Sequence, residues 1–205
     1  MPALWTSQEK LLLASTSTTR LMLLVSAGLP VETQGSGVDE RKVEEAARNE
    51  ALDPPSLAQR LAAEKALAVS RRHPERIVLG ADQVLDHAGT VFHKPGTREA
   101  AKAQLQSLAG KRHSLHSAGA LAIGGQVVES FVASAHLTMR PLTEEAVDLY
   151  LDLAGPEILQ SVGVYQVEGL GIHLFETVDG DHSTILGLPL LPLLSALRRL
   201  GCLPL

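Results

Sequence analysis

Residues 11–20 read Leu11-Leu12-Leu13-Ala14-Ser15-Thr16-Ser17-Thr18-Thr19-Arg20, and the apolar run Leu21–Leu24 follows. This pattern is typical of a short buried strand that turns into a helix. A turn of hydroxyl residues at a helix start lies beside free backbone N–H groups at the positive end of the helix, where anions bind. Arg20 adds a planar guanidinium group suited to phosphate oxygens. We therefore predict an anion site here, although Ser15 and Ser17 would also serve as ordinary helix caps.

The composition predicts a soluble globular protein. The chain has 205 residues, of which 45% are hydrophobic and 20% charged, so it can bury the core of one domain or of two closely packed lobes. Its net charge is −5 and it has no long basic run, which argues against nucleic acid or an anionic membrane as a partner. Cys202 is the single cysteine, which excludes an internal disulfide and favours a reducing compartment. Residues 1–10 do not resemble a signal peptide and no apolar stretch is long enough to span a bilayer, so we expect a cytoplasmic protein.

The order of the remaining patterns predicts a mixed α/β fold. A capping box at Ser56-Leu57-Ala58-Gln59 opens a predicted helix, and the apolar run that ends at Asp82 predicts a buried strand. Turn signals at 86–89 and at Gly124-Gly125 predict two hairpins. We expect further strands at 31–33, 113–123, 126–138 and 172–178, and helices at 97–108, after Thr143 and after Pro189. A boundary between two lobes is placed near Gly110.

Two carboxylates and two lysines are candidate site residues. Asp82 directly follows an apolar run, where an unpaired charge would be costly, so a functional role is favoured. Glu40 and Asp82 offer oxygen ligands for a hard divalent cation, or a base for water. Lys65 and Lys94 offer positive charge for phosphates, as Arg20 does. The alternatives are a solvated helix start for Glu40, a surface position for Lys65 and a loop charge for Lys94.

Other motifs favour plain structural roles. None of the eight histidines has the helical spacing of a zinc motif. Gly35-Ser36-Gly37 and Gly169-Leu170-Gly171 are too short to be dinucleotide fingerprints, so we interpret both as turns.

Taken together, the motifs resemble those of Maf-like nucleotide pyrophosphatases. They occur in the family's order over about residues 11–200 and comprise Ala14-Ser15-Thr16-Ser17 with Arg20, Val38-Asp39-Glu40, Glu64-Lys65-Ala66, Gly80-Ala81-Asp82, Lys94-Pro95, Leu108-Ala109-Gly110-Lys111-Arg112-His113, Gly169-Leu170-Gly171, Gly180-Asp181 and Gly187-Leu188-Pro189-Leu190. The resemblance implies one Maf-like domain over residues 1–205, with an extended mixed β-sheet flanked by helices and two lobes around a nucleotide cleft. This fold is of the inosine-triphosphate-pyrophosphatase type.

The resemblance also implies an activity, namely metal-dependent hydrolysis of a nucleoside triphosphate to the monophosphate and pyrophosphate. By this resemblance, Asp82 matches the family's proposed base and Glu40 matches an acid linked to the metal. Both carboxylates are expected to hold Mg²⁺ or Mn²⁺. The phosphate-binding groups correspond to Ser15, Ser17, Arg20, Lys65 and Lys94. A homodimer is a family expectation. The alternative function is a non-catalytic nucleotide-binding regulator of cell division, because the family is linked by name to septum formation.

Several positions differ from the usual family pattern or distinguish one branch of the family from another. Many members have Ser-Pro-Arg-Arg in the first turn, where this chain has Ser17-Thr18-Thr19-Arg20. The branch that prefers dTTP and UTP has Thr and Gln where Gln83 and Glu168 stand, and this pair is similar to the branch that acts on 7-methyl-GTP. Thr19 takes the place of an expected aromatic residue. We expect Gln83, Glu168 and Thr19 near the base, and Glu168 to accept hydrogen bonds from guanine; the alternative is that Glu168 faces solvent.

Overall fold

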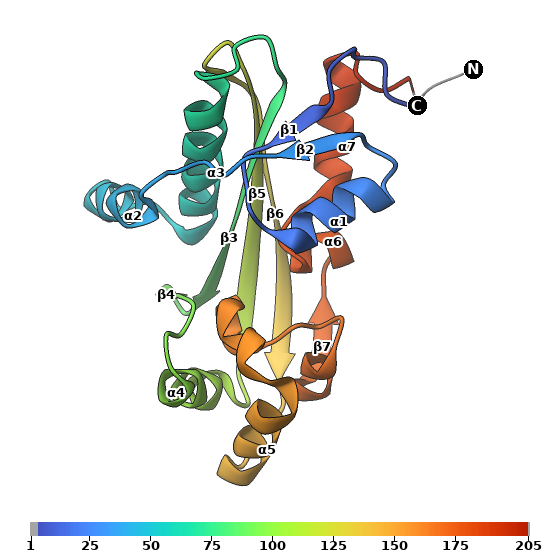
Figure 1. Cartoon of the computed structure of the whole chain (residues 1–205). Coiled ribbons are helices and arrows are strands. Elements are labelled where there is room, and N and C mark those ends of the chain that lie inside the picture. The colour runs from blue at the N-terminus through green and yellow to red at the C-terminus, as the bar shows by residue number, and fades with distance from the viewer. Residues whose placement is uncertain (1–3, 205) are drawn as a thin grey trace.

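The computed structural model describes residues 4–204, so residues 1–3 and 205 of the predicted 1–205 domain lie outside the described part. Its centre is a seven-stranded mixed sheet in the order β2-β1-β3-β5-β6-β7, with β4 paired to β3 (Figure 1). The strands are β1 (Leu11–Leu13), β2 (Val31–Thr33), β3 (Val78–His87), β4 (Thr90–Phe92), β5 (Arg112–Ile123), β6 (Gln126–Met139) and β7 (Phe175–Asp179). β1 pairs in parallel with β2 and β3, whereas the other pairs are antiparallel. This arrangement confirms the predicted fold class.

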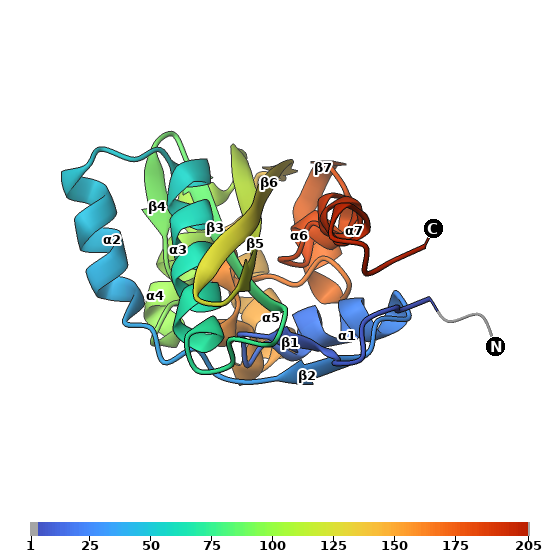
Figure 2. The same ribbon diagram turned by 90° about the horizontal axis from the view of Figure 1, so that it is seen from above.

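Helices cover both faces of the sheet. They are α1 (Thr18–Ser26), α2 (Glu40–Asn49), α3 (Pro54–Ser70), α4 (Arg98–Leu108), α5 (Glu144–Ala154), α6 (His182–Ile185) and α7 (Leu190–Arg199). Figure 2 shows α3 on one side of β5 and β6, and α1 and α7 on the other. The alternation of side chains along β1 fits both layers, because Leu11 and Leu13 pack with α1 and α7 while Leu12 packs with Val69 of α3. Among the described residues, no helix is both long and apolar enough to cross a bilayer.

Two groups of helices sit at opposite ends of the three long strands (Figure 1). At one end lie α1, α3 and α7, and at the other α4 and α5 pack on a separate apolar cluster around Leu85, Leu115 and Leu137. Gly110 lies in the turn between α4 and β5. Because β3, β5 and β6 run through both groups, the two lobes share one sheet, and their division into domains stays a prediction.

Most predicted elements are confirmed, with three corrections at their ends. The strand at Asp82 does not stop there: β3 continues to His87, because Asp82 and Val84 pair with Ala118 and His116 of β5. The helix predicted from Ser56 begins at Pro54, since Asp53 accepts a hydrogen bond from the Ser56 backbone N–H at 2.9 Å.

Pro54 and Pro55 fit the first turn of α3, because the first N–H groups of a helix have no intrahelical partners.

The strand predicted at 172–178 begins only at Phe175, because residues Leu170–Leu174 form a 3₁₀-helix. The short helix α6 was not predicted.

Gly80 allows α3 to lie unusually close to β3. A Cβ atom on Gly80 would lie 2.1 Å from the carbonyl oxygen of Ala62 and 2.5 Å from the backbone nitrogen of Ala66. No side chain fits at such distances, so a glycine is required here. This contact fixes the part of α3 that carries Lys65 directly against the strand that carries Asp82.

We predict that Gly80→Ala destabilises the protein by about 3 kcal/mol, because the added methyl group forces α3 away from β3. Chemical denaturation of the purified variant measures this loss. Gly96→Ala is the matched control, since none of the described heavy atoms beyond its chain neighbours lies within 4 Å of the added atom, and it should change the free energy of unfolding by less than about 0.5 kcal/mol. Equal stabilities for the two variants would show that the close approach is not required.

Candidate active site

A cleft opens where one edge of β3 lacks a neighbouring strand. On that edge, β1 pairs with β3 as far as Leu79, and β4 pairs with it from Leu85 onward. The stretch Gly80–Val84 lies between these two pairings. A cavity of about 960 Å³ is lined by Asp82, Gln83 and Val84 of this stretch. Asp82 therefore lies within its own strand, yet beyond the carboxyl end of the parallel neighbour β1, where α/β sheets bind ligands.

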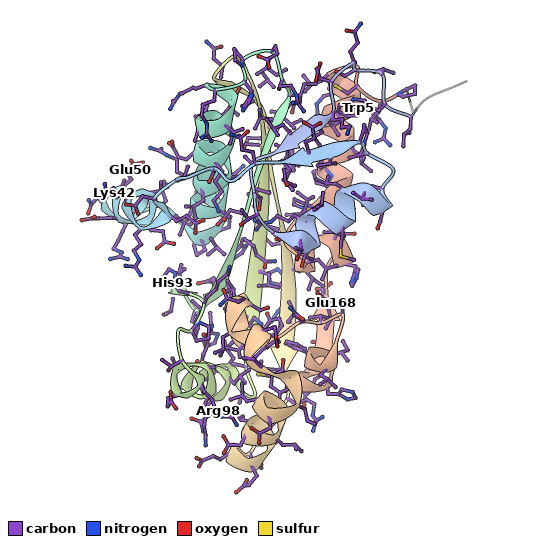
Figure 3. The ribbon with its side chains drawn as sticks, viewed as in Figure 1. Trp5, Lys42, Glu50, His93, Arg98 and Glu168 are labelled. Carbon is purple, nitrogen blue, oxygen red and sulfur yellow. The ribbon has the colours of Figure 1, made fainter. Side chains whose placement is uncertain are left out.

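All ten predicted site residues line this one cavity, although they are spread over more than 150 positions of the chain. They are Ser15, Ser17, Thr19, Arg20, Glu40, Lys65, Asp82, Gln83, Lys94 and Glu168. They come from the turn after β1, the middle of β3, the starts of α1 and α2, the middle of α3, and two loops. In Figure 3, His93 marks the loop below α2 that carries Lys94, and Glu168 marks the loop below α1.

The hydroxyl turn after β1 both caps α1 and holds Arg20. Ser17 Oγ accepts a hydrogen bond from the Arg20 backbone N–H at 3.3 Å, and Ser15 Oγ accepts one from the Ser17 N–H at 3.1 Å. The Arg20 guanidinium donates through Nε to the carbonyl of Gly187 at 2.8 Å, and its Nη1 lies 3.5 Å from Ser15 Oγ. The cap interpretation and the anion-site interpretation are thus compatible, because Ser15 and Ser17 accept from backbone N–H groups while the Arg20 side chain lines the cavity.

Lys65 joins the two predicted carboxylates. Its Nζ donates to Asp82 Oδ1 and lies 2.6 Å from Glu40 Oε1. Lys65 and Asp82 are buried, with 7% and 8% of their surface exposed, whereas about half of the Glu40 side chain is exposed. Lys65 is therefore not a surface lysine, and the buried Asp82 carboxylate has a partner.

Electrostatic effects in this cluster shift two pKa values. Partial burial by itself raises the pKa of Glu40, but the hydrogen bond and charge of Lys65, with the charges of Lys94 and Arg20, hold this pKa below its usual value. Burial lowers the pKa of Arg20, and the carboxylates of Asp82 and Glu40 oppose this shift. An arginine stays protonated nonetheless. Glu40 and Arg20 are therefore both charged near neutral pH.

The donor set fits a hard divalent cation that also binds phosphate. The described residues contain no group of three or more His, Cys, Asp or Glu side chains placed to hold a metal. Mg²⁺, however, commonly binds through one or two carboxylates together with substrate phosphates and water. The charged lining of the cavity consists of four cations and four carboxylates, apart from His93: Arg20, Arg41, Lys65 and Lys94 against Glu40, Glu44, Asp82 and Glu168. A polyphosphate would thus gain from a bound divalent cation, for which Glu40 and Asp82 are the suitable ligands.

Gln83 and Glu168 also line the cavity. The Gln83 amide nitrogen donates to the backbone carbonyl of Ile185 at 2.9 Å. Glu168 is exposed and lines the cavity, so it faces both solvent and the cleft.

A buried pair anchors the loop that leads to Glu168. Tyr165 hydrogen-bonds His113 at 2.7 Å between Tyr165 Oη and His113 Nε2. Burial, with a smaller contribution from the charge of His87, lowers the pKa of His113 to about 4, so this imidazole is neutral at physiological pH.

Several lining residues were not predicted as site residues. The turn Gly35-Ser36-Gly37 lines the cavity, as do Arg41, Glu44, His93 and Gly187. A signal for the Gly-Ser-Gly turn was present: it follows β2, and the carboxyl ends of parallel strands lie at the same edge of a sheet. That Arg41 and Glu44 line the cavity could have been inferred from Glu40, because residues one and four positions further along α2 face the same cleft. His93 and Gly187 carry no comparable signal.

The fold and this cleft define an α/β protein with a charge-lined ligand site. The chain belongs to the Maf-like protein family, whose family model matches residues 10–200. A nucleoside triphosphate pyrophosphatase of Rhodopseudomonas palustris (strain BisB18) is 51% identical over 96% of each chain. A 7-methyl-GTP pyrophosphatase of Bartonella henselae is 50% identical over 93% of this chain and 96% of that protein. A solved HAM1 protein of Coxiella burnetii matches 63% of this chain and 72% of its own with a TM-score of 0.37 and 15% identity, a likeness too slight to bear on the site.

We predict that Lys65→Met costs about 3 kcal/mol of stability, because it leaves the buried Asp82 carboxylate beside Glu40 without its cation. The double variant Lys65→Met/Asp82→Asn should recover part of this loss, since it also removes the buried charge. Urea denaturation of both variants and the parent measures the difference.

Lys42→Met is the control, because 82% of the Lys42 side chain is exposed, and it should cost less than about 0.5 kcal/mol. A loss for Lys65→Met no larger than that of the control would contradict the paired cluster.

Proposed function

We propose that the chain is a nucleoside triphosphate pyrophosphatase, which hydrolyses its substrate to the nucleoside monophosphate and pyrophosphate. The observation that carries this proposal is the buried contact of Lys65 with Asp82 and Glu40 at the floor of the cleft, in a chain that belongs to the Maf-like family. A pure binding site has little need for two carboxylates where a polyanion must bind. Hydrolysis needs such groups, because water must be oriented and deprotonated.

The phosphate chain is bound by the hydroxyl turn and the cations around it. Arg20 already uses Nε for the Gly187 carbonyl, so its terminal nitrogens are the groups left for phosphate oxygens. Ser15 and Ser17 lie beside it at the start of α1, and Lys94 reaches the cavity from the loop after β4. These groups stabilise the negative charge that develops on the leaving pyrophosphate.

Asp82 is the proposed base. One of its carboxylate oxygens takes a proton from a water molecule, and the oxygen of that water attacks the α-phosphorus. The bond between the α-phosphorus and the bridging oxygen breaks, and pyrophosphate leaves with the electron pair. Lys65 holds the Asp82 carboxylate in place through its hydrogen bond. Glu40 and Asp82 are the residues that would hold Mg²⁺ or Mn²⁺, which would supply positive charge to the phosphates.

We predict that Asp82→Asn lowers kcat by a factor of about one hundred or more, because the amide keeps the volume of the side chain and cannot accept the proton of water. A coupled pyrophosphate-release assay with Mg²⁺ or Mn²⁺ measures turnover. Asp152→Asn is the matched control, since its mostly exposed carboxylate pairs with Arg98 on the surface, and it should retain parental turnover. Parental turnover in Asp82→Asn would remove this residue from the mechanism.

For the base, we propose a guanine-type substrate, with 7-methyl-GTP as the leading candidate. Gln83 and Glu168 both line the cavity, and a 7-methyl-GTP pyrophosphatase is 50% identical to this chain. A carboxylate at Glu168 accepts hydrogen bonds from N1–H and the exocyclic amine of guanine. It also attracts the positive charge of a methylated base. Thr19 lies at the same cavity and leaves space where an aromatic side chain would stand.

We predict a higher kcat/KM for 7-methyl-GTP than for dTTP or UTP. Glu168→Gln should reduce this preference by roughly ten- to a hundredfold, because one charged acceptor becomes a neutral amide and a charge-assisted hydrogen bond is worth about 1.5–3 kcal/mol. Steady-state kinetics on the three substrates provide the test. Glu176→Gln, on exposed β7, is a control that should keep the parental ranking. A parent that prefers dTTP, or an unchanged ranking in Glu168→Gln, would exclude the base assignment while leaving the hydrolytic reaction intact.

The alternative of a non-catalytic regulator of septum formation is less well supported. It explains neither the buried Lys65 cluster nor the position of Glu40 beside it. A cytoplasmic location and a homodimer remain predictions from the sequence and the family.

A further inference from the structure

A buried glutamine on α4 lies between two loops that line the cavity. Gln104 is only 9% exposed, and its helix neighbours Ala101, Leu105 and Leu108 pack in an apolar cluster. A buried amide is costly unless its polar atoms find partners. Gln104 finds its two partners outside α4, one on each of the two loops.

The partners are backbone groups of His93 and Gly163. With the amide assigned from these partners, Gln104 Nε2 donates to the carbonyl oxygen of His93 at 3.2 Å, and Oε1 accepts from the Gly163 N–H at 3.1 Å. The reverse orientation would set oxygen against oxygen and nitrogen against nitrogen. Gln104 therefore joins the loop that carries Lys94 to the loop that leads to Glu168, and His93 and Glu168 mark these two loops in Figure 3.

The backbone around Gly163 has an unusual conformation. Gly163 has a φ angle of +81°, and the β-branched Val164 has one of +61°. A β-branched residue keeps a positive φ only where the surrounding contacts hold it there. Tyr150 on α5 supplies one such contact, because its hydroxyl donates to the Val164 carbonyl at 3.0 Å. Gln104 adds a contact that also links this turn to the loop of Lys94.

We propose that Gln104 is a positioning residue, which holds Lys94 at the phosphate-binding side of the cleft by tying its loop to the opposite one. This inference rests on the proposed function. Gln104 is not one of the described residues that line the cavity, whereas His93, Lys94 and residues 160–162 and 165–168 are. An ammonium group on a flexible stem is only as well placed as the backbone that carries it. Fixing this backbone in advance lowers the entropic cost of contacting a phosphate.

The contact is tested first without substrate. Gln104→Met keeps the length of the side chain and leaves the His93 carbonyl and the Gly163 N–H without their partner. We expect the melting temperature to fall by roughly 5–10 °C and the Gly163 amide to exchange hydrogen about tenfold faster. Gln106→Met, on the exposed surface of the same helix, is the control and should shift the melting temperature by less than about 2 °C. Equal protection of the Gly163 amide in both variants would overturn the contact.

The positioning role is tested by a double-mutant cycle with Lys94→Ala, measured as kcat/KM for 7-methyl-GTP. In the parent, Gln104→Met should lower kcat/KM about threefold to tenfold, because Lys94 loses part of a charge-assisted hydrogen bond to phosphate. In Lys94→Ala it should lower kcat/KM by less than about twofold, since no ammonium group is left to position. A general loss of stability would lower both values by the same factor, and that outcome would overturn the positioning role.

Gln104→Asn is the second variant, for use if Gln104→Met is too unstable to purify. Its amide sits one methylene group shorter and cannot reach both loops, so the same pattern in the cycle is expected and equal losses in both backgrounds would again overturn the role. A parent that releases no pyrophosphate from 7-methyl-GTP, GTP, dTTP or UTP would instead contradict the proposed function. The exchange experiment would then still decide whether Gln104 joins the two loops.

Discussion

The contact of one buried ammonium group with two carboxylates is the interaction on which the cleft depends. Lys65 can reach Asp82 only because Gly80 lets α3 lie against β3, with Ala62 and Ala66 at the point of contact. A buried ion pair adds little stability compared with well-packed apolar side chains, and it becomes costly when one partner is removed. We therefore interpret the cluster as a device that holds Asp82 and Glu40 in fixed positions, and its energetic cost is offset by the apolar packing of α3 around it.

The cleft itself arises from an interruption in the pairing of strands. β1 is only three residues long and β4 begins further along β3, so the middle of β3 has one edge open to ligands. The other edge of β3 pairs with β5 from Val78 to Asp86, so this opening lies beside a continuous part of the sheet. The phosphate-binding turn after β1 and the loops that carry Lys94 and Glu168 are then attached to one sheet rather than to independent domains.

The short helix α6 and the residues after it hold two side chains of the candidate site. Its last carbonyls orient Gln83, and the carbonyl of the following Gly187 receives the Arg20 side chain. Asp181 caps this helix by accepting from the Thr184 backbone N–H at 3.1 Å. The short segment 182–187 thereby fixes a group assigned to the base and a group assigned to the phosphates. Their relative position is set by backbone atoms, which no single side-chain substitution removes.

The sequence by itself determined the elements, because hydrophobic periodicity, caps and glycine turns act locally. The hairpin at Gly124-Gly125, the helix capped by Thr143 and the hydroxyl turn before α1 all follow from neighbouring residues. The motifs also identified ten residues that prove to line one cavity, since each motif retains its own local pattern. The extent of β3 beyond Asp82 could not be predicted, because the pairing that continues it comes from β5.

Only the tertiary structure decided which groups meet. Nothing near Lys65 in the sequence shows that it contacts both carboxylates, because their approach results from the packing of α3 at Gly80. Nor does the sequence near Gln83 show which of its amide atoms faces the cavity, since that depends on carbonyls about one hundred residues away, at Thr184 and Ile185. Hydrogen bonds and ion pairs act over a few ångströms in space, whatever the separation along the chain.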